Sequence, residues 1–239
     1  MFAIYKKEMK IFFTTMEGYI AISVFFIVNS LVLWYIPSDF NIFTNNKASL
    51  LPFFSISPWV LLFLMPSITM KMISYETAQR TNLILFTKPI QKWKIIFSKF
   101  LASVTIGITA VLPSLIFVYS IYQLSSPQGN MDQGELICSY SGLILLIGLY
   151  SAIGVFCSSI SKNTMIAFIS TALIILILYF GIHFASIFYD ISFFEHLSIQ
   201  YHYESISRGV IDSRDITYFV SLTVLFLYFS TILIETENI

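Results

Sequence analysis

Six long stretches of almost uninterrupted apolar residues dominate the sequence, and shorter polar intervals separate them. A helix that crosses a bilayer needs about 20 predominantly apolar residues, and each stretch is of this order. Aromatic residues such as Trp34, Trp59 and Tyr189 lie near the expected ends, where amphipathic rings prefer the headgroup level. The expected spans are 18–36, 57–74, 99–124, 137–160, 164–189 and 216–234. The pattern therefore predicts an all-α membrane protein with six transmembrane helices in a single domain, residues 1–239.

A helical repeat precedes the first span. The apolar residues that recur at helical spacing are Phe2, Tyr5, Met9, Phe12 and Met16. Lys6, Lys7 and Lys10 lie elsewhere on the helical wheel. We therefore predict an amphipathic helix in the membrane interface, with these lysines near the anionic headgroups of membrane lipids. The alternative, the start of a signal peptide, is disfavoured because no small-residue cleavage site follows the apolar run.

Positive charges are distributed unevenly between the two sides that six spans define. Six spans put both termini on one side, and Lys and Arg concentrate in cytoplasmic loops. Of the thirteen Lys and Arg residues, only Lys47, Arg208 and Arg214 fall in loops on the side away from the termini. We therefore expect both termini in the cytoplasm. The longest outer loop, 190–215, mixes aromatic, apolar and charged residues, and we expect short helices at the outer interface there, with a plain surface loop as the alternative.

Composition supports a membrane protein and excludes other classes. Only 11% of the residues are charged, against about a quarter in soluble domains, so lipid must face much of the chain. The formal net charge of zero argues against a nucleic-acid partner, which would need a basic face. Cys138 and Cys157 cannot form a disulfide if both lie on one helix, because their separation would be about 28 Å.

The sequence lacks the residues that several kinds of catalysis or ion coupling need. A phosphate-binding loop requires G-x-x-x-x-G-K-[ST], and the nearest approach, Gly154 followed by Lys162, has the wrong spacing. The interiors of the spans hold no ionisable relay for a coupling ion, which argues against secondary transport. His196 and His202 lie in the outer loop, where solvated residues are favoured over a metal site. We therefore expect no cofactor, no metal and no enzymatic activity in this chain.

The polar interval 71–99 is the most basic part of the chain. It contains Lys71, Arg80, Lys88, Lys92, Lys94 and Lys99. Residues 75–86 suit a short helix, which Pro89 ends because proline also biases the preceding residue toward an extended shape. Residues 91–99 then resume a basic helix that leads into the third span. A helix held in this way between two spans is a suitable lever, although a basic loop that meets anionic headgroups is the simpler alternative.

Small residues in the fourth span are spaced for close helix packing. Gly148 and Ala152 are four residues apart, as are Gly154 and Ser158. This spacing lets the backbone of a neighbouring helix approach closely. The neighbour can belong to this chain or to a second copy.

Residues 70–102 resemble the inner loop of ABC-2 type transporter permeases. The residues that match the family pattern are Glu76, Thr81, Ile84, Leu85, Phe86, Thr87, Pro89, Lys99 and Phe100. Arg80 and Leu83 stand where that family usually has Gly and Glu. Residues 148–168 also resemble the family, and residues 203–226 are similar to the gliding-motility-associated permease subunits of ABC transporters.

The resemblance implies a transmembrane permease subunit of an ABC transporter in the bacterial inner membrane. The coupling segment that it implies comprises Glu76, Arg80, Thr81, Leu83, Phe86, Thr87 and Pro89. A separate cytoplasmic ATPase subunit would bind ATP and Mg²⁺, and a second permease copy or a membrane subunit with a large outer domain would complete the assembly. The rival hypothesis is a membrane anchor or scaffold that transports nothing. An intramembrane enzyme is disfavoured because the sequence lacks paired acids and metal ligands.

Overall fold

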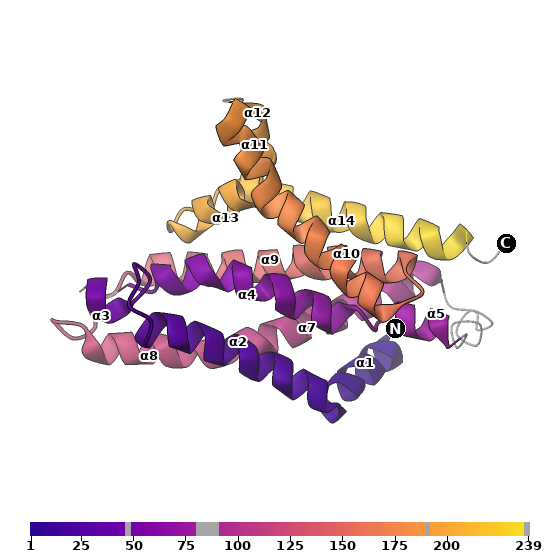
Figure 1. The fold of residues 1–239 in the computed structure, drawn as a ribbon, viewed down its shortest axis with the longest axis horizontal. Coiled ribbons are helices and arrows are strands. Elements are labelled where there is room, and N and C mark those ends of the chain that lie inside the picture. Colours follow the sequence, from indigo (N-terminus) through magenta and orange to yellow (C-terminus); the bar gives the residue numbers. More distant parts are fainter. Residues whose placement is uncertain (46–48, 80–90, 190–191, 237–239) are drawn as a thin grey trace.

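The computed structural model describes residues 1–45, 49–79, 91–189 and 192–236. The structure is 84% helical, and the described ranges contain no strand. Six of its helical stretches are long and apolar enough to cross a membrane. The predicted all-α membrane architecture is therefore confirmed (Figure 1).

The described residues form a series of helices. In chain order they are α1 (Phe2–Thr14), α2 (Met16–Trp34), α3 (Ile42–Asn45), α4 (Leu51–Thr69), α5 (Ser74–Ala78), α7 (Lys92–Val111), η1 (Leu112–Ser114), α8 (Leu115–Leu124), α9 (Gln133–Ile160), α10 (Thr164–Leu176), η2 (Ile177–Gly181), α11 (Ile182–Tyr189), α12 (Ser192–Leu197), α13 (Ile199–Ser207) and α14 (Ser213–Thr236).

Several spans begin earlier than the apolar pattern predicts. The second span starts at Leu51 instead of residue 57, because Pro52 is accepted in the first turn of a helix, where its missing N–H has no partner to lose. The third starts at Lys92 instead of residue 99, and the fourth at Gln133, where the Asp132 side chain caps the helix. Apolar content locates the part of a helix inside the membrane, whereas the helix itself continues into polar sequence.

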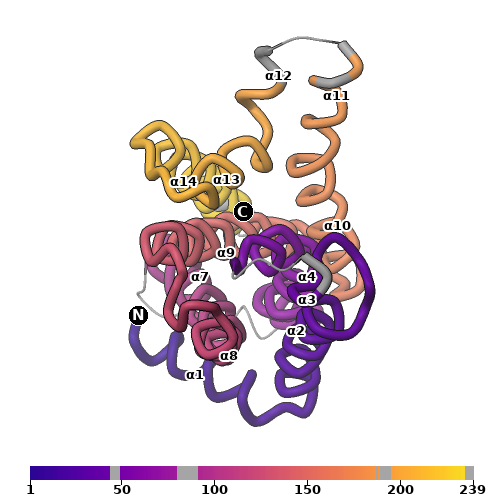
Figure 2. The backbone as a smooth tube through the Cα atoms, turned by 90° about the vertical axis from the view of Figure 1, so that its left-hand side faces the viewer, coloured from indigo at the N-terminus to yellow at the C-terminus, as the bar shows by residue number. Residues whose placement is uncertain are grey.

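Helix α9 lies at the centre of the bundle. It packs against α4, α7, α10, α13 and α14, and 72% of the most apolar stretch of this span is buried. The corresponding stretches are only 22% buried in α2, 22% buried in the span Thr164–Ser186, which begins with α10, and 11% buried in α14. Figure 2 shows these three helices at the periphery and α10 and α11 leaning away from the bundle. Their exposed apolar side chains are what a lipid-facing surface requires.

Two spans change helical geometry along their length. In the third span, α7 and α8 are joined by the 3₁₀ turn η1, which contains Pro113. Proline has no N–H to donate to the preceding turn, so a break at this point is expected. In the fifth span the π-helix η2 separates α10 from α11. There the ring of Phe180 stacks on Trp59 of α4, with the centroids 3.8 Å apart.

The loop between the fifth and sixth spans contains two short helices, α12 and α13, and it is not a solvated segment throughout. His202 is buried, with Nδ1 2.6 Å from Asp215 Oδ1 and Nε2 2.8 Å from the His196 carbonyl oxygen. The Tyr203 hydroxyl donates a 2.8 Å hydrogen bond to the carbonyl of Phe54. The expectation that His202 is a solvated loop residue is therefore wrong. Within the described ranges, His, Cys, Asp and Glu residues form no group of three or more able to hold a metal ion.

Candidate functional site

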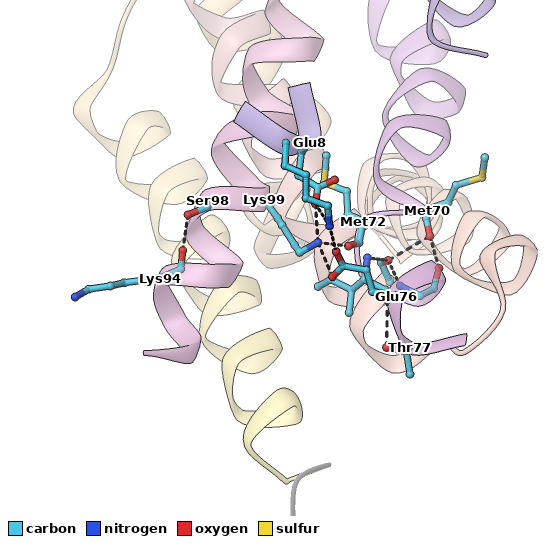
Figure 3. A network of polar contacts seen from close by, with 12 residues as sticks. Glu8, Met70, Met72, Glu76, Thr77, Lys94, Ser98 and Lys99 are labelled. Carbon is cyan, nitrogen blue, oxygen red and sulfur yellow. Dashed lines mark hydrogen bonds and ion pairs between the residues drawn. The ribbon is translucent and has the colours of Figure 1, made fainter. Parts of the chain in front are cut away.

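A cluster of charged side chains joins three elements at the end of the bundle that carries the N-terminus. Glu8 comes from α1, Glu76 from α5 and Lys99 from α7 (Figure 3). We call these residues, together with Lys7, the inner charge cluster, because the termini are predicted to lie on the inner side of the membrane.

Lys99 is the centre of this cluster. Only 1% of the residue is exposed. Its ammonium lies 2.9 Å from Glu8 Oε1 and 2.9 Å from Glu76 Oε2, and it also donates to the carbonyl of Met72. A lysine ammonium has three donors, and all three are satisfied here. A buried charge persists when it is paired and hydrogen-bonded in this way.

Lys7 is the second cation of the cluster. Its Nζ lies 2.5 Å from Glu76 Oε1 and 3.8 Å from Glu8 Oε1. Burial by itself lowers the pKa of the Lys7 ammonium, but the hydrogen bond and charge of Glu76 and the charge of Glu8 raise that pKa above its ordinary value. Two lysines and two glutamates thus balance one another, so the cluster carries no net charge.

The amphipathic repeat of α1 explains how Glu8 reaches Lys99. Ile4 and Glu8 are four residues apart and are the two buried residues of α1, so they face the bundle together. On the same side, the Tyr5 hydroxyl donates to Thr105 Oγ1 of α7 at 3.3 Å. The lysines of this helix were among the predicted site residues, whereas Glu8 was not. The signal was present, because Glu8 lies at the edge of the apolar face of this helix, one turn after the apolar residue Ile4.

Helix α5 is held in place by a hydroxyl of α9. Ser158 Oγ accepts hydrogen bonds from the N–H groups of Ile73 and Ser74 at 3.1 and 3.0 Å. The same hydroxyl donates to the carbonyl of Met70 at 3.2 Å. A helix leaves its first N–H groups without intrahelical partners. Ser158 satisfies two such groups at the start of α5 and fixes the helix to the central helix.

The small residues of α9 differ in how closely a neighbouring helix approaches them. A Cβ built on Gly154 would lie 2.1 Å from Thr69 Oγ1 at the end of α4, so this glycine permits the close approach of the two helices. Ala152 is fully buried. A Cβ built on Gly148 meets no atom of the described chain within 4 Å. The close contact therefore lies at Gly154 and Ser158, near the inner charge cluster.

The structure describes part of the coupling segment that the sequence suggests. Glu76 lies in the inner charge cluster, and Lys99, which also matches the family pattern, is at its centre. Lys6 and Lys10 lie on the exposed side of α1, and their contact with lipid headgroups stays a prediction. The remaining residues of the segment lie outside the described residues; they are Arg80, Thr81, Leu83, Phe86, Thr87 and Pro89.

The inner charge cluster is suited to transmitting force. Removing one partner of a buried ion pair costs about 3–5 kcal/mol, because the other charge is left uncompensated. Glu76 of α5 is thus joined to α7 and α1 through Lys99, and the start of α5 is joined to α9 through Ser158. These two sets of contacts connect four helices that come from different parts of the sequence.

Comparison with known proteins agrees with this architecture. The sequence profile of the family described as "ABC-2 family transporter protein" matches residues 2–234, which is nearly the whole chain. No curated protein matches the sequence at a significant level. Proteins of this family are membrane components, not ATPases themselves, and work with an ABC ATPase. The chain therefore belongs to the ABC-2 family and is a multi-pass transmembrane permease subunit of an ABC transporter.

Proposed function

We propose that this permease receives mechanical work from its ATPase through α5 and the residues that follow it, and that the inner charge cluster passes the work to α1 and α7. The observation that carries the proposal is the buried ammonium of Lys99, which bridges Glu8 and Glu76 at 2.9 Å each. A loop that only met headgroups would have no need of a buried cation at its base.

The exposed end of α5 supports the same proposal. Ala78 and Gln79, at the end of this helix, are exposed, whereas Ser74 at its start is fully buried. The helix is thus anchored at one end and accessible at the other, which is the geometry of a lever. ATP and Mg²⁺ would bind to the partner subunit, and the cycle would switch the permease between two arrangements of its helices.

The distribution of positive charges and the family resemblance bear on the orientation of the chain and on its partners. The bias of Lys and Arg toward the side of the termini supports a cytoplasmic location for both ends and for α5, in a bacterial inner membrane. The chain would act as one transmembrane domain, paired with a second copy or with a membrane subunit that has a large outer domain. The similarity of residues 203–226 to gliding-motility-associated permease subunits supports a role in that process.

Cross-linking tests whether α5 meets the ATPase. A cysteine is introduced at Gln79, in a chain that carries Cys138→Ala and Cys157→Ala, and the chain is purified together with its ATPase. The matched control is a cysteine at Ser213, an exposed residue at the start of α14. We expect the cysteine at position 79 to cross-link to the ATPase and the cysteine at position 213 not to do so. Absence of a cross-link from position 79 would exclude the lever.

Transmission through the cluster is tested by ATPase activity. We expect addition of the permease to change the ATPase rate, and Lys99→Met to abolish that change while the two proteins still co-purify. Lys94→Met, in the same helix but outside the cluster, is expected to behave as wild type. A membrane anchor or scaffold would leave the ATPase rate unchanged in all three cases.

Orientation is checked by reporters, which are expected to read as cytoplasmic after Ile239 and as external at Gln128.

A further inference from the structure

A cavity of about 480 Å³ lies beside the inner charge cluster, between α1, α2, α4 and α5. Its volume falls in the range of about 300–1,000 Å³ that is usual for ligand sites. The walls are largely apolar and include Phe12 of α1, Ala21 of α2 and Ile68 of α4. An apolar site at this level of the bundle is suited to the acyl chains of an amphiphile, because α1 is the helix expected to lie in the membrane interface.

The rim of the cavity carries a pair of opposite charges. Lys71 and Glu17 form an ion pair there, with side chains that are 45% and 62% exposed. Exposed ion pairs contribute little to stability. A ligand with both charges can therefore separate Lys71 from Glu17 and pair with each of them. By contrast, Glu8 and Glu76, which also line the cavity, are already bound to Lys99.

The charges select the class of ligand. Of the charged residues that line the cavity, Lys7, Glu8 and Glu76 belong to the inner charge cluster, where Lys99 completes the balance of charges. This leaves one cation, Lys71, and one anion, Glu17, at the rim. A headgroup with only a negative charge would pair with Lys71 and leave Glu17 without its partner. A phosphate would accept hydrogen bonds from Lys71, and a primary ammonium would donate to Glu17, as in other charge-assisted hydrogen bonds. A quaternary ammonium has no N–H to donate.

We propose that this cavity binds one glycerophospholipid whose headgroup contains a phosphate and a primary ammonium, as in phosphatidylethanolamine. The acyl chain occupies the apolar interior, and the headgroup replaces the ion pair between Lys71 and Glu17. The site belongs to the permease alone. Its test therefore needs no ATPase, and its failure would leave the proposed coupling mechanism unaffected.

The experiment measures which lipid the purified full chain retains. The protein is incubated with equal amounts of phosphatidylethanolamine, phosphatidylglycerol and phosphatidylcholine with identical acyl chains, and bound lipid is counted by native mass spectrometry. We expect one phosphatidylethanolamine per chain and a preference of about tenfold over the other two lipids, which corresponds to one charge-assisted contact.

Three variants locate the site. Ala21→Trp fills the cavity and is expected to remove the bound lipid, whereas Val24→Trp, on an exposed part of the same helix, is expected to retain it. Glu17→Gln changes an exposed side chain, so the fold is kept, and it is expected to abolish the preference for phosphatidylethanolamine. Equal retention of the three lipids by wild type would overturn the proposal. So would unchanged binding by Ala21→Trp, or an unchanged preference in Glu17→Gln.

Discussion

Replacement of Lys99 by methionine tests the inner charge cluster most directly. Methionine has a similar length and no charge, so the change removes the bridge between Glu8 and Glu76 with little change in packing. The Met72 carbonyl also loses its donor. Lys7 remains beside Glu76 at 2.5 Å, so the uncompensated charge is mainly that of Glu8.

The structure sets the expected magnitude. The loss of one partner from a buried ion pair costs about 3–5 kcal/mol. The side chains of Glu8 and Glu76 are 10% and 15% exposed, so water can reach them in part, and we expect the lower end of that range. The double variant Lys99→Met with Glu8→Gln leaves one lysine, Lys7, and one glutamate, Glu76, in the cluster. We therefore expect it to recover about 1–3 kcal/mol relative to Lys99→Met alone.

The assay is equilibrium unfolding in mixed micelles, with helix content followed by circular dichroism. The free energy of unfolding is compared among wild type, Lys99→Met, Glu8→Gln and the double variant. Lys94→Met is the control, because the Lys94 side chain points away from the cluster (Figure 3). We expect this control to lie within about 0.5 kcal/mol of wild type. If Lys99→Met were equally close to wild type, or if the double variant were no more stable than Lys99→Met, the reasoning would be refuted.

Further predictions concern the supports of the cluster. Gly154→Ala is expected to destabilise the protein by about 1–3 kcal/mol in thermal unfolding, because the added methyl group overlaps α4, whereas Gly148→Ala is expected to be neutral or to stabilise by up to about 1 kcal/mol. Ser158→Ala is expected to speed hydrogen exchange in α5, because two N–H groups lose their acceptor. Lys7→Met is expected to lower stability at neutral pH. Because the pKa of Lys7 is raised in the folded state, that difference is full below the ordinary value of 10.5 and is lost as the pH rises from there through the raised value.

Each of these predictions has a contrary outcome. Equal thermal stabilities of Gly154→Ala and Gly148→Ala would show that α4 and α9 do not depend on a close approach at this point. Unchanged exchange in Ser158→Ala, judged against Ser159→Ala, whose hydroxyl bonds within its own helix, would show that the Ser158 hydroxyl does not hold α5. A difference between wild type and Lys7→Met that grew with rising pH would contradict the pairing of Lys7 with Glu76.

The sequence was sufficient to predict the elements that membrane thickness and helical periodicity dictate. A run of about 20 apolar residues can satisfy its backbone in a bilayer only as a helix, so six such runs predict six spans without knowledge of their neighbours. The spacing of apolar residues before the first span likewise predicts α1. The spacing of small residues also predicted the close helix contact at Gly154, although the same spacing predicted one equally at Gly148.

The tertiary structure alone decided which polar residues are buried, and beside what. From the sequence, Lys99 is predicted to be a basic residue at the start of a span. In the fold it is buried, because Glu8, 91 residues away, and Glu76 supply opposite charges. His202 is buried for a similar reason, because Asp215 lies 2.6 Å from it. Periodicity shows which residues share a face of a helix, but burial of a charge depends on partners from other helices. Apolar length therefore determined the spans of this permease, and the meeting of charges from distant segments determined its candidate coupling site.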